Sequence, residues 1–185
     1  MASPRVFSFV ANLYLRTEDG MLPWKRHETT WRALFGVRTS LSDEDFLSGE
    51  PPISHSAVVL VLRRALGELC GVKPGLVHPR DRMGELSQAM GAGGFLGWVV
   101  DLSHGCLDTM EFDELVRKAI ESVIGESPKI GSIASCVIRV EKKEKSWRGL
   151  ACRSWCHLVA KEMSSSSRVQ KYCQLLKEAG ENHTH

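Results

Sequence analysis

The stretch from residue 105 to residue 115, Gly-Cys-Leu-Asp-Thr-Met-Glu-Phe-Asp-Glu-Leu, has the pattern of the acidic opening of an amphipathic helix. Asp108 is followed three residues later by Glu111, a spacing typical of a capping box, in which each side chain accepts a hydrogen bond from a free amide of the first turn. Acidic side chains are also favoured there by the helix dipole. The apolar residues that recur near helical spacing before Gly125 are Leu107, Met110, Leu115, Ala119, Ile120, Val123 and Ile124.

Helical patterns also precede this stretch. Short helices are expected near residues 29–36 and 42–47, and the strongest helix of the first half is expected over 54–70, with Ser54 or Ser56 as its N-cap. The predicted buried face of this third helix consists of Val58, Val59, Leu62, Ala65, Leu66 and Leu69. The turn residues that follow it alternate with apolar side chains, which indicates an ordered loop held against the core.

The C-terminal third continues in the same way. Residues 130–140 have the texture of a short strand, with a helical turn as the alternative, and the charged run 141–145 is expected to be solvated and to mark a boundary. Two helices are expected over 146–180, separated by the serine run 164–167. The tail 181–185 is expected to be disordered. The predicted fold class is therefore mainly α, with at most one short strand.

Composition excludes several classes of function. Lys plus Arg number 24 and Asp plus Glu number 22, so the chain lacks the basic field that drives binding to nucleic acid. No apolar run approaches the roughly 20 residues of a membrane span, and residues 1–15 lack a small-residue cleavage site typical of a signal peptide. The 6 cysteines are irregularly spaced, so reduced thiols and a cytoplasmic location are expected.

Three motifs, taken in order, resemble the acyl carrier protein family. The first is a helix end at 69–74 (Leu-Cys-Gly-Val-Lys-Pro), and the second is a loop at 77–83 (Val-His-Pro-Arg-Asp-Arg-Met). The third is the helix opening at 107–112 (Leu-Asp-Thr-Met-Glu-Phe), which is similar to the family's Asp-Ser-Leu-Asp-(Thr/Ser)-(Val/Met)-Glu-(Leu/Phe) signature. The resemblance covers about residues 54–125, which is less than half of the chain.

The resemblance implies a small helical bundle at 54–125, with a helical extension at 1–53, a linker or short strand at 126–145 and further helices at 146–180. In this family the second helix carries an acidic docking surface for enzymes that have basic patches. A serine at the start of that helix carries a phosphopantetheine arm, which moves an acyl group among active sites at high effective concentration.

Two departures from the family pattern bear on function. Cys106 stands at the position of the phosphopantetheine-bearing serine, and Gly105 replaces the aspartate before it. A thiol is not the normal acceptor of that group, so no cofactor and no standard phosphopantetheine attachment are expected. Ser103 is a nearby hydroxyl, three residues out of register. The second departure is an insertion at about 87–105, which lengthens the loop before the second helix.

The leading hypothesis is a non-enzymatic, divergent acyl-carrier-like protein that docks a partner protein with a basic patch. The predicted docking residues are Asp108, Glu111, Asp113 and Glu114. The alternative is a helical interaction or regulatory module without acyl chemistry, in which the C-terminal helices that bear Trp147 and Trp155 bind a protein. A third reading is a small enzyme that uses Cys106 and His104, because a thiol near a helix N-terminus has a lowered pKa.

A metal site is not expected from the cysteines near the C-terminus. Cys152 and Cys156 are four residues apart and share a helix face, and His157 follows directly. A structural zinc site needs a second pair of cysteine or histidine ligands at a standard spacing, which the sequence lacks. Packing inside a helical core explains these residues better.

Overall fold

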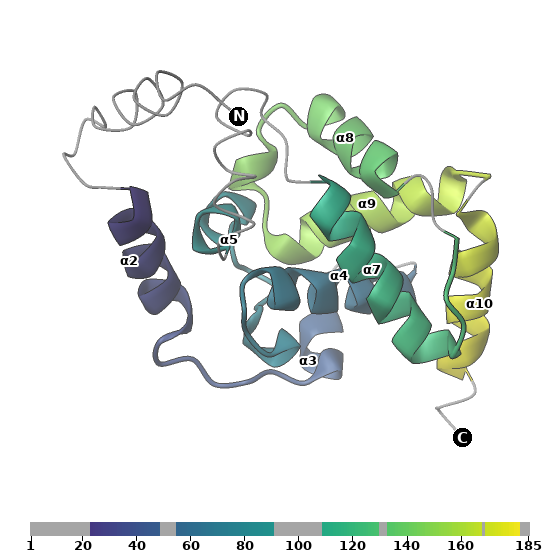
Figure 1. Ribbon diagram of the computed structural model, residues 1–185, viewed down its shortest axis with the longest axis horizontal. Coiled ribbons are helices and arrows are strands. Elements are labelled where there is room, and N and C mark those ends of the chain that lie inside the picture. Colours follow the sequence, from purple (N-terminus) through teal and green to yellow (C-terminus); the bar gives the residue numbers. More distant parts are fainter. Residues whose placement is uncertain (1–22, 49–54, 91–108, 130–132, 168, 182–185) are drawn as a thin grey trace, which may run out of the picture.

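The computed structural model describes residues 23–48, 55–90, 109–129, 133–167 and 169–181. This part of the chain is mainly helical and has no strand, which confirms the predicted fold class (Figure 1). Its α-helices are α2 (Pro23–Phe35), α3 (Asp43–Leu47), α4 (Ser56–Leu69), α5 (Met83–Ala89), α7 (Thr109–Ile124), α8 (Ile133–Lys143), α9 (Cys152–Ser165) and α10 (Gln170–Glu181). Two 3-10 turns, η1 (Pro74–Leu76) and η2 (Trp147–Gly149), lie between them.

Helix α4 lies at the centre of the fold, in contact with α7, α9, α10 and η1. Every residue predicted for its buried face is buried, because apolar side chains at helical spacing form one continuous stripe. Its N-terminus differs from the prediction. Ser56 is the first helical residue, and the N-cap is His55, which has a left-handed φ of 84° and makes no side-chain capping bond. Gly71, at a φ of 67°, follows the C-cap, as is typical of a helix end.

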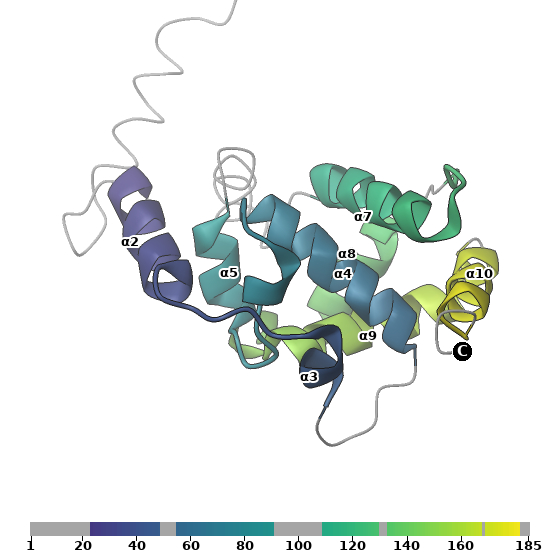
Figure 2. The same ribbon diagram turned by 90° about the horizontal axis from the view of Figure 1, so that it is seen from below.

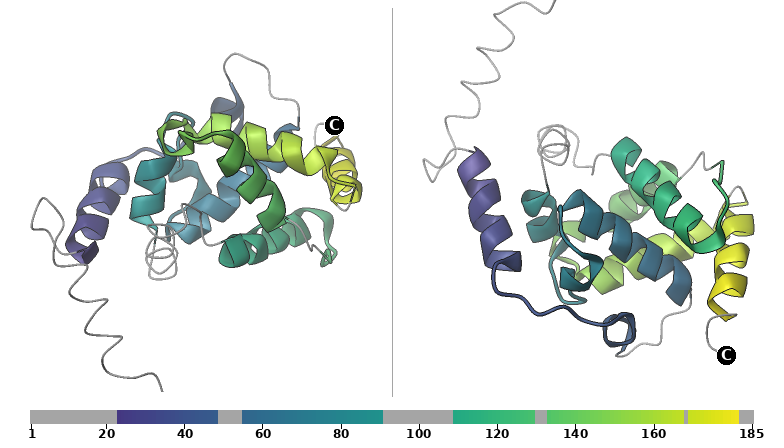
Figure 3. Two further views of the ribbon diagram at one scale, coloured as in Figure 1. Left: turned by 90° about the horizontal axis from the view of Figure 1, so that it is seen from above. Right: turned by 60° about the horizontal axis from the view of Figure 1, so that its bottom comes forward.

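The pairing of α4 with α7 joins the two helices on which the carrier-like resemblance depends (Figure 2). Helix α10 packs on both of them, and α8 packs on α7 and α9. One cluster of buried apolar side chains extends from Phe35 in α2 to Leu176 in α10. The regions before and after 54–125 therefore share a core with the bundle and do not form separate extensions. Helix α2 lies at the outer edge, against α5 (Figure 3).

The predicted strand near 130–140 is wrong for residues 133–140, which belong to α8. The buried side chains of this segment are Ile133, Cys136, Val137 and Val140. Their spacing of three, one and three residues is helical, so one face of α8 packs against α7 and α9. The β-branched residues suggested a strand, but the period of the buried positions decides the structure.

The expected linker at 126–145 is also revised. Helix α8 continues through the charged run to Lys143, and Glu141 is only 6% exposed. Lys142, Lys143 and Lys145 are exposed, as expected for a solvated charged run, and Glu144 is half-buried. The boundary predicted at 141–145 is therefore the end of a core helix.

Both tryptophans of the C-terminal region are buried. Trp147 is 5% exposed in η2, and Trp155 is fully buried in α9. The Trp155 ring makes an edge-to-face contact with Phe112 of α7, with the ring centroids 5.8 Å apart. These side chains hold α9 to the bundle, so they do not form the exposed binding surface proposed for the alternative hypothesis.

Several expectations concern residues that lie outside the described ranges. They are the N-terminal segment 1–22, most of the insertion at 87–105 and the tail 182–185. Within the described ranges, no helix is both long and apolar enough to cross a membrane.

Candidate functional site

Helix α7 buries most of the apolar stripe that the sequence suggested. Ile120 is fully buried, Ala119 is 5% exposed, and the stripe residues partly buried against the same core are Leu115, Val123 and Ile124. Met110, expected in the stripe, is 82% exposed instead. Contact with α4 and Trp155 adds Phe112 and Val116 to the buried face.

Met110 lies on the outer face of α7 near two predicted docking residues. Glu111 and Glu114 are both exposed, and Glu114 lies four residues after Met110 and three after Glu111, so it links the three side chains along the helix surface. An exposed methionine with charged side chains near it fits a protein-binding surface, because methionine is enriched in interfaces and their rims are polar. We call Met110, Glu111 and Glu114 the α7 head.

Arg117 fixes the position of one carboxylate of the α7 head. Its Nε donates a hydrogen bond to Glu114 Oε2 at 2.7 Å, and its Nη1 lies 3.4 Å from Glu121 Oε2. The hydrogen bond from Arg117 lowers the pKa of Glu114, so that carboxylate stays ionised well below neutral pH. The same contact screens the acidic charge, and the head is therefore less acidic than the sequence alone suggested.

Asp113 does not belong to the exposed acidic face. Its carboxylate accepts a hydrogen bond from the backbone amide of Ala134 in the first turn of α8, while Oδ1 is buried and has no hydrogen-bond partner among the described residues. Asp113 thus supplies to α8 the acceptor that an N-cap side chain normally provides. The structure gives this half-buried carboxylate a contact between two helices, and its role in partner docking remains a prediction.

Burial raises the pKa of the Asp113 carboxyl from 3.8 to about 6, although the Ala134 amide opposes the shift. The folded state therefore holds this proton more tightly than the unfolded state, so the contribution of Asp113 to stability is fully present below about pH 4 and is lost as the pH rises through 6. In the Asp113→Asn variant we expect the loss of stability between pH 4.5 and pH 7 to be smaller by about 1 kcal/mol, after allowance for solvent screening. Urea unfolding of the original protein and of the variant, each at pH 4.5 and pH 7, measures this difference in the free energy of unfolding. An identical pH dependence in the two proteins would contradict the raised pKa.

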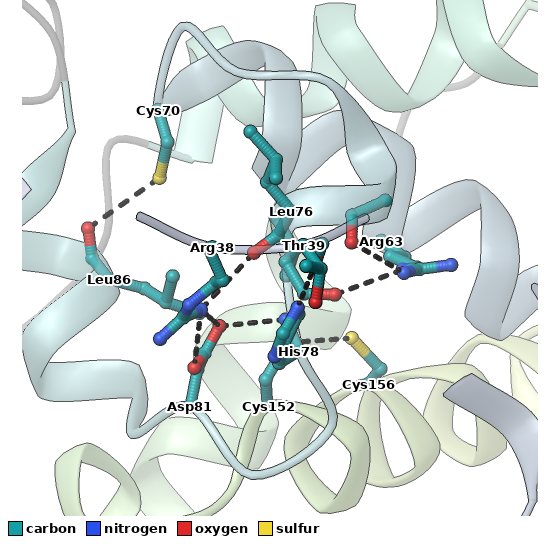
Figure 4. Close-up of polar contacts among 12 residues, drawn as sticks. Arg38, Thr39, Arg63, Cys70, Leu76, His78, Asp81, Leu86, Cys152 and Cys156 are labelled. Carbon is teal, nitrogen blue, oxygen red and sulfur yellow. Dashed lines mark hydrogen bonds and ion pairs between the residues drawn. The ribbon is translucent and has the colours of Figure 1, made fainter. Parts of the chain in front are cut away.

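The second carrier-like motif is an ordered loop held by Asp81 (Figure 4). The Asp81 carboxylate accepts hydrogen bonds from Arg38 Nη1 at 2.7 and 2.8 Å and from the backbone amide of His78 at 2.7 Å. Arg38 also donates to Leu76 O, and His78 Nε2 lies 3.0 Å from Thr39 O. Buried Val77 and Met83 flank the loop. The aspartate therefore closes the turn and ties it to the segment before α3.

The same loop caps helix α9. The amide of Cys152 donates to Asp81 O at 2.6 Å, and the amide of Arg153 donates to Pro79 O at 3.1 Å. The N-cap residue of α9, Ala151, has no side chain that could accept these bonds. Backbone carbonyls of the loop thus satisfy amides that every helix N-terminus leaves free. This contact, which the sequence could not indicate, joins the carrier-like region to the C-terminal helices.

Arg63 is the residue of this region that the sequence reasoning missed. It lies in the middle of α4, is 1% exposed, and its guanidinium stacks 4.4 Å above the Phe46 ring. It donates to Asp43 Oδ1 at 2.7 Å and to the backbone carbonyl oxygens of Leu41, Ser42, Gly75 and Val77. The chain between α2 and α3 runs as an extended segment (Figure 2). Arg63 donates hydrogen bonds both to the end of this segment and to the loop after α4.

Of the cysteines in the described ranges, Cys173 is half-buried, and the buried ones are Cys70, Cys136, Cys152 and Cys156. Cys152 Sγ lies 4.0 Å from Cys156 Sγ, and their hydrogen bond and burial raise the pKa of Cys152. Burial also raises the pKa of Cys70 to about 12, so that thiol stays protonated. In the described part of the chain, no three Cys, His, Asp or Glu side chains are grouped so as to hold a metal ion.

The remaining predicted site residues lie outside the described ranges. They are Ser103, His104, Cys106 and Asp108. The roles suggested for them, as attachment points, as a reactive thiol pair and as an N-cap, remain predictions.

Comparison with known proteins gave no match: no family model, no curated protein and no solved structure is similar to this chain.

Proposed function

We propose that this protein is a divergent acyl-carrier-like protein that docks a partner enzyme through the α7 head and carries no standard phosphopantetheine arm. The observation that supports this most is the exposure of Met110, at 82%, beside the exposed Glu111 and Glu114. Methionine is enriched in protein interfaces, and binding of a partner would remove this apolar side chain from water.

The setting of the α7 head supports the same proposal. Helix α7 packs on α4, and the loop with the second carrier-like motif is ordered by Asp81. Both features are what the resemblance requires of a carrier-like bundle. Because α7 is held by buried Phe112 and Val116, its outer face is presented on a rigid element, and docking does not require the helix to be ordered first.

The alternative, an interaction module without acyl chemistry, makes a different prediction about partners. It would bind a protein through some other face, and its binding would not depend on the α7 head. The two readings can therefore be separated by substitutions on that head alone.

The test uses two carrier-dependent enzymes with basic docking patches, a broad-specificity phosphopantetheinyl transferase and a condensing synthase. We expect the full chain to bind at least one of them with a Kd that rises with salt, because exposed charges contribute to the contact. In the Glu111→Gln/Glu114→Gln variant the Kd should rise about fivefold to tenfold, and in Met110→Ala by a similar factor. Surface plasmon resonance measures these values.

The matched control is Glu68→Gln/Glu85→Gln, which removes the same charge from exposed positions on α4 and α5. We expect it to change the Kd by less than about twofold. Equal effects of the two double variants, or no binding to either enzyme, would contradict the proposal. After incubation with the transferase and coenzyme A, peptide mass spectrometry should detect no added mass on Cys106 or Ser103. An added phosphopantetheine would contradict the proposal that the chain carries no standard arm.

A further inference from the structure

Two exposed arginines flank the buried aspartate of the loop after α4. Arg80 and Arg82 are exposed and form no ion pair with any other described residue, whereas Asp81 between them is 6% exposed. Both carboxylate oxygens of Asp81 accept hydrogen bonds from Arg38 Nη1, and one of them also accepts from the His78 amide (Figure 4). The carboxylate between the two exposed arginines therefore faces inward and is already paired with a third arginine.

The backbone fixes the position of the two arginines relative to α9. Arg82 and Ala151 form an isolated antiparallel bridge. In the same contact, the Arg153 amide donates a hydrogen bond to Pro79 O, next to Arg80, at 3.1 Å. Because the two segments run in opposite directions, Arg80 and Arg82 lie along the start of α9 together with Arg153. The N-terminal end of this 14-residue helix adds the partial positive charge of its dipole.

Further cations lie beside the two arginines. The turn η2 packs against α5, which begins directly after Arg82, and it carries Arg148, whose guanidinium carbon lies 5.4 Å from the centroid of the Trp147 ring. The cations of residues 79–85 and 144–154 are Arg80, Arg82, Lys145, Arg148 and Arg153, and the carboxylates other than Asp81 are Glu85 and Glu144. Because the whole chain carries a formal charge of only +2, this excess of cations is a local feature.

The composition of this surface indicates the kind of anion that fits it. Most of its cations are arginines, whose planar guanidinium groups bind carboxylates through two parallel hydrogen bonds. A nucleic acid would need a longer basic stripe and exposed aromatic rings, and Trp147 is only 5% exposed. An anionic membrane surface favours basic patches with exposed apolar side chains, and among the described residues the large exposed ones, Val37 and Met110, lie on other segments. An acidic protein segment fits best.

We propose that Arg80, Arg82, Arg148 and Arg153, which we call the arginine surface, bind an acidic segment of a partner protein. Arg80 and Arg82 supply the guanidinium groups to which carboxylates of the partner bind. The contacts of Asp81 and the capping of α9 hold the loop in place before binding, which reduces the entropy lost on association. The inference goes beyond docking at the α7 head, because the two surfaces share no residue and attract partners of opposite charge.

The test uses a fluorescein-labelled, unstructured peptide of about 12 residues in which glutamate and serine alternate. We expect the full chain to bind this peptide with a Kd that rises with salt. Amide chemical-shift changes in nitrogen-15 NMR spectra should be confined to residues 77–85 and 144–154. The same peptide with glutamine in place of glutamate should bind at least about tenfold more weakly.

The variant Arg80→Gln/Arg82→Gln should raise the Kd of the acidic peptide roughly tenfold. Its matched control, Lys161→Gln/Lys171→Gln, removes two exposed cations from α9 and α10 and should change the Kd by less than about twofold. Circular dichroism melting verifies that both variants remain folded.

Equal Kd values for the two double variants, shifts centred on other residues, or no binding at about 1 mM peptide would overturn the proposal. Two further probes are a single-stranded DNA of about 12 nucleotides and phosphatidylserine vesicles. Tighter binding of either probe than of the peptide, lost in Arg80→Gln/Arg82→Gln, would overturn the proposal in favour of a nucleic acid or a lipid surface.

Discussion

Replacement of Arg63 by alanine is expected to lower the free energy of unfolding by about 3–5 kcal/mol, one of the two largest effects that the structure predicts. The guanidinium is 1% exposed, and its donors reach Asp43 and four backbone carbonyl oxygens from the segment before α4 and from the loop after it. Truncation leaves these acceptors without their partner, and it leaves a cavity beside Phe46. Urea unfolding followed by circular dichroism measures the change.

Arg64 provides the matched control, because it is the next residue of α4 and its guanidinium also faces Asp43. Its Nη2 lies 3.9 Å from Asp43 Oδ2, and its side chain is 39% exposed. The Arg64→Ala variant should lose less than about 1 kcal/mol, since exposed ion pairs contribute little. Similar losses for the two alanine variants would contradict the role assigned to Arg63.

Arg63→Lys distinguishes charge from geometry if Arg63→Ala does not fold. Lysine keeps the positive charge for Asp43, but it lacks the planar fork that reaches carbonyls on two sides. We expect an intermediate loss of stability, with local opening of the loop at 74–81 detected as faster amide exchange. Full retention of stability would show that charge alone is sufficient.

Arg63 also illustrates which parts of the fold a sequence can reveal. The stripe of α4 was predictable because Val58, Leu62 and Leu66 recur at helical spacing and all are buried. Arginine is rarely buried without partners, and its partners here come from residues 20 or more positions earlier and from a loop about 12–14 positions later. The only local signal was a charged residue within an apolar helix, which an exposed position explains equally well.

The errors at α7 and α8 have a different origin. In α7, Met110 and Phe112 each fit a helical stripe, and contacts with α4 and with Trp155 of α9 bury Phe112 and leave Met110 exposed. In α8, residues such as Ile133 and Val137 favour a strand locally, whereas packing on α7 and α9 selects the helix. The residues next to Asp113 in the sequence are typical of an exposed acidic helix. The amide that donates a hydrogen bond to its carboxylate belongs to Ala134, about 20 residues later, so local sequence could not reveal this contact.

The candidate site was therefore predicted in part. The position of the acidic helix and the exposure of Glu111 and Glu114 followed from local pattern, because charged residues in a first turn remain solvated unless another element covers them. The exposure of Met110 could not be predicted, because it depends on which tertiary contacts the first turn of α7 makes.

The second large effect is expected in helix α7, where replacement of Phe112 by alanine should lower the free energy of unfolding by about 3–5 kcal/mol. Phe112 is fully buried, and its ring meets that of Trp155 at an interplanar angle of 73° with centroids 5.8 Å apart. The substitution removes a large apolar surface from the core and the aromatic contact that joins α7 to α9. Thermal and urea unfolding of the full chain measure the loss.

Met110→Ala is the matched control, because it truncates an apolar side chain two residues away in the same helix. Met110 is 82% exposed, so its truncation should change the free energy of unfolding by less than about 0.5 kcal/mol. The same variant should weaken enzyme binding at the α7 head, whereas a mildly destabilised core variant such as Phe112→Leu should bind normally while it remains folded. The opposite result, with loss of stability in Met110→Ala and none in Phe112→Ala, would mean that α7 is rotated and that the exposed face assigned to docking is the buried one.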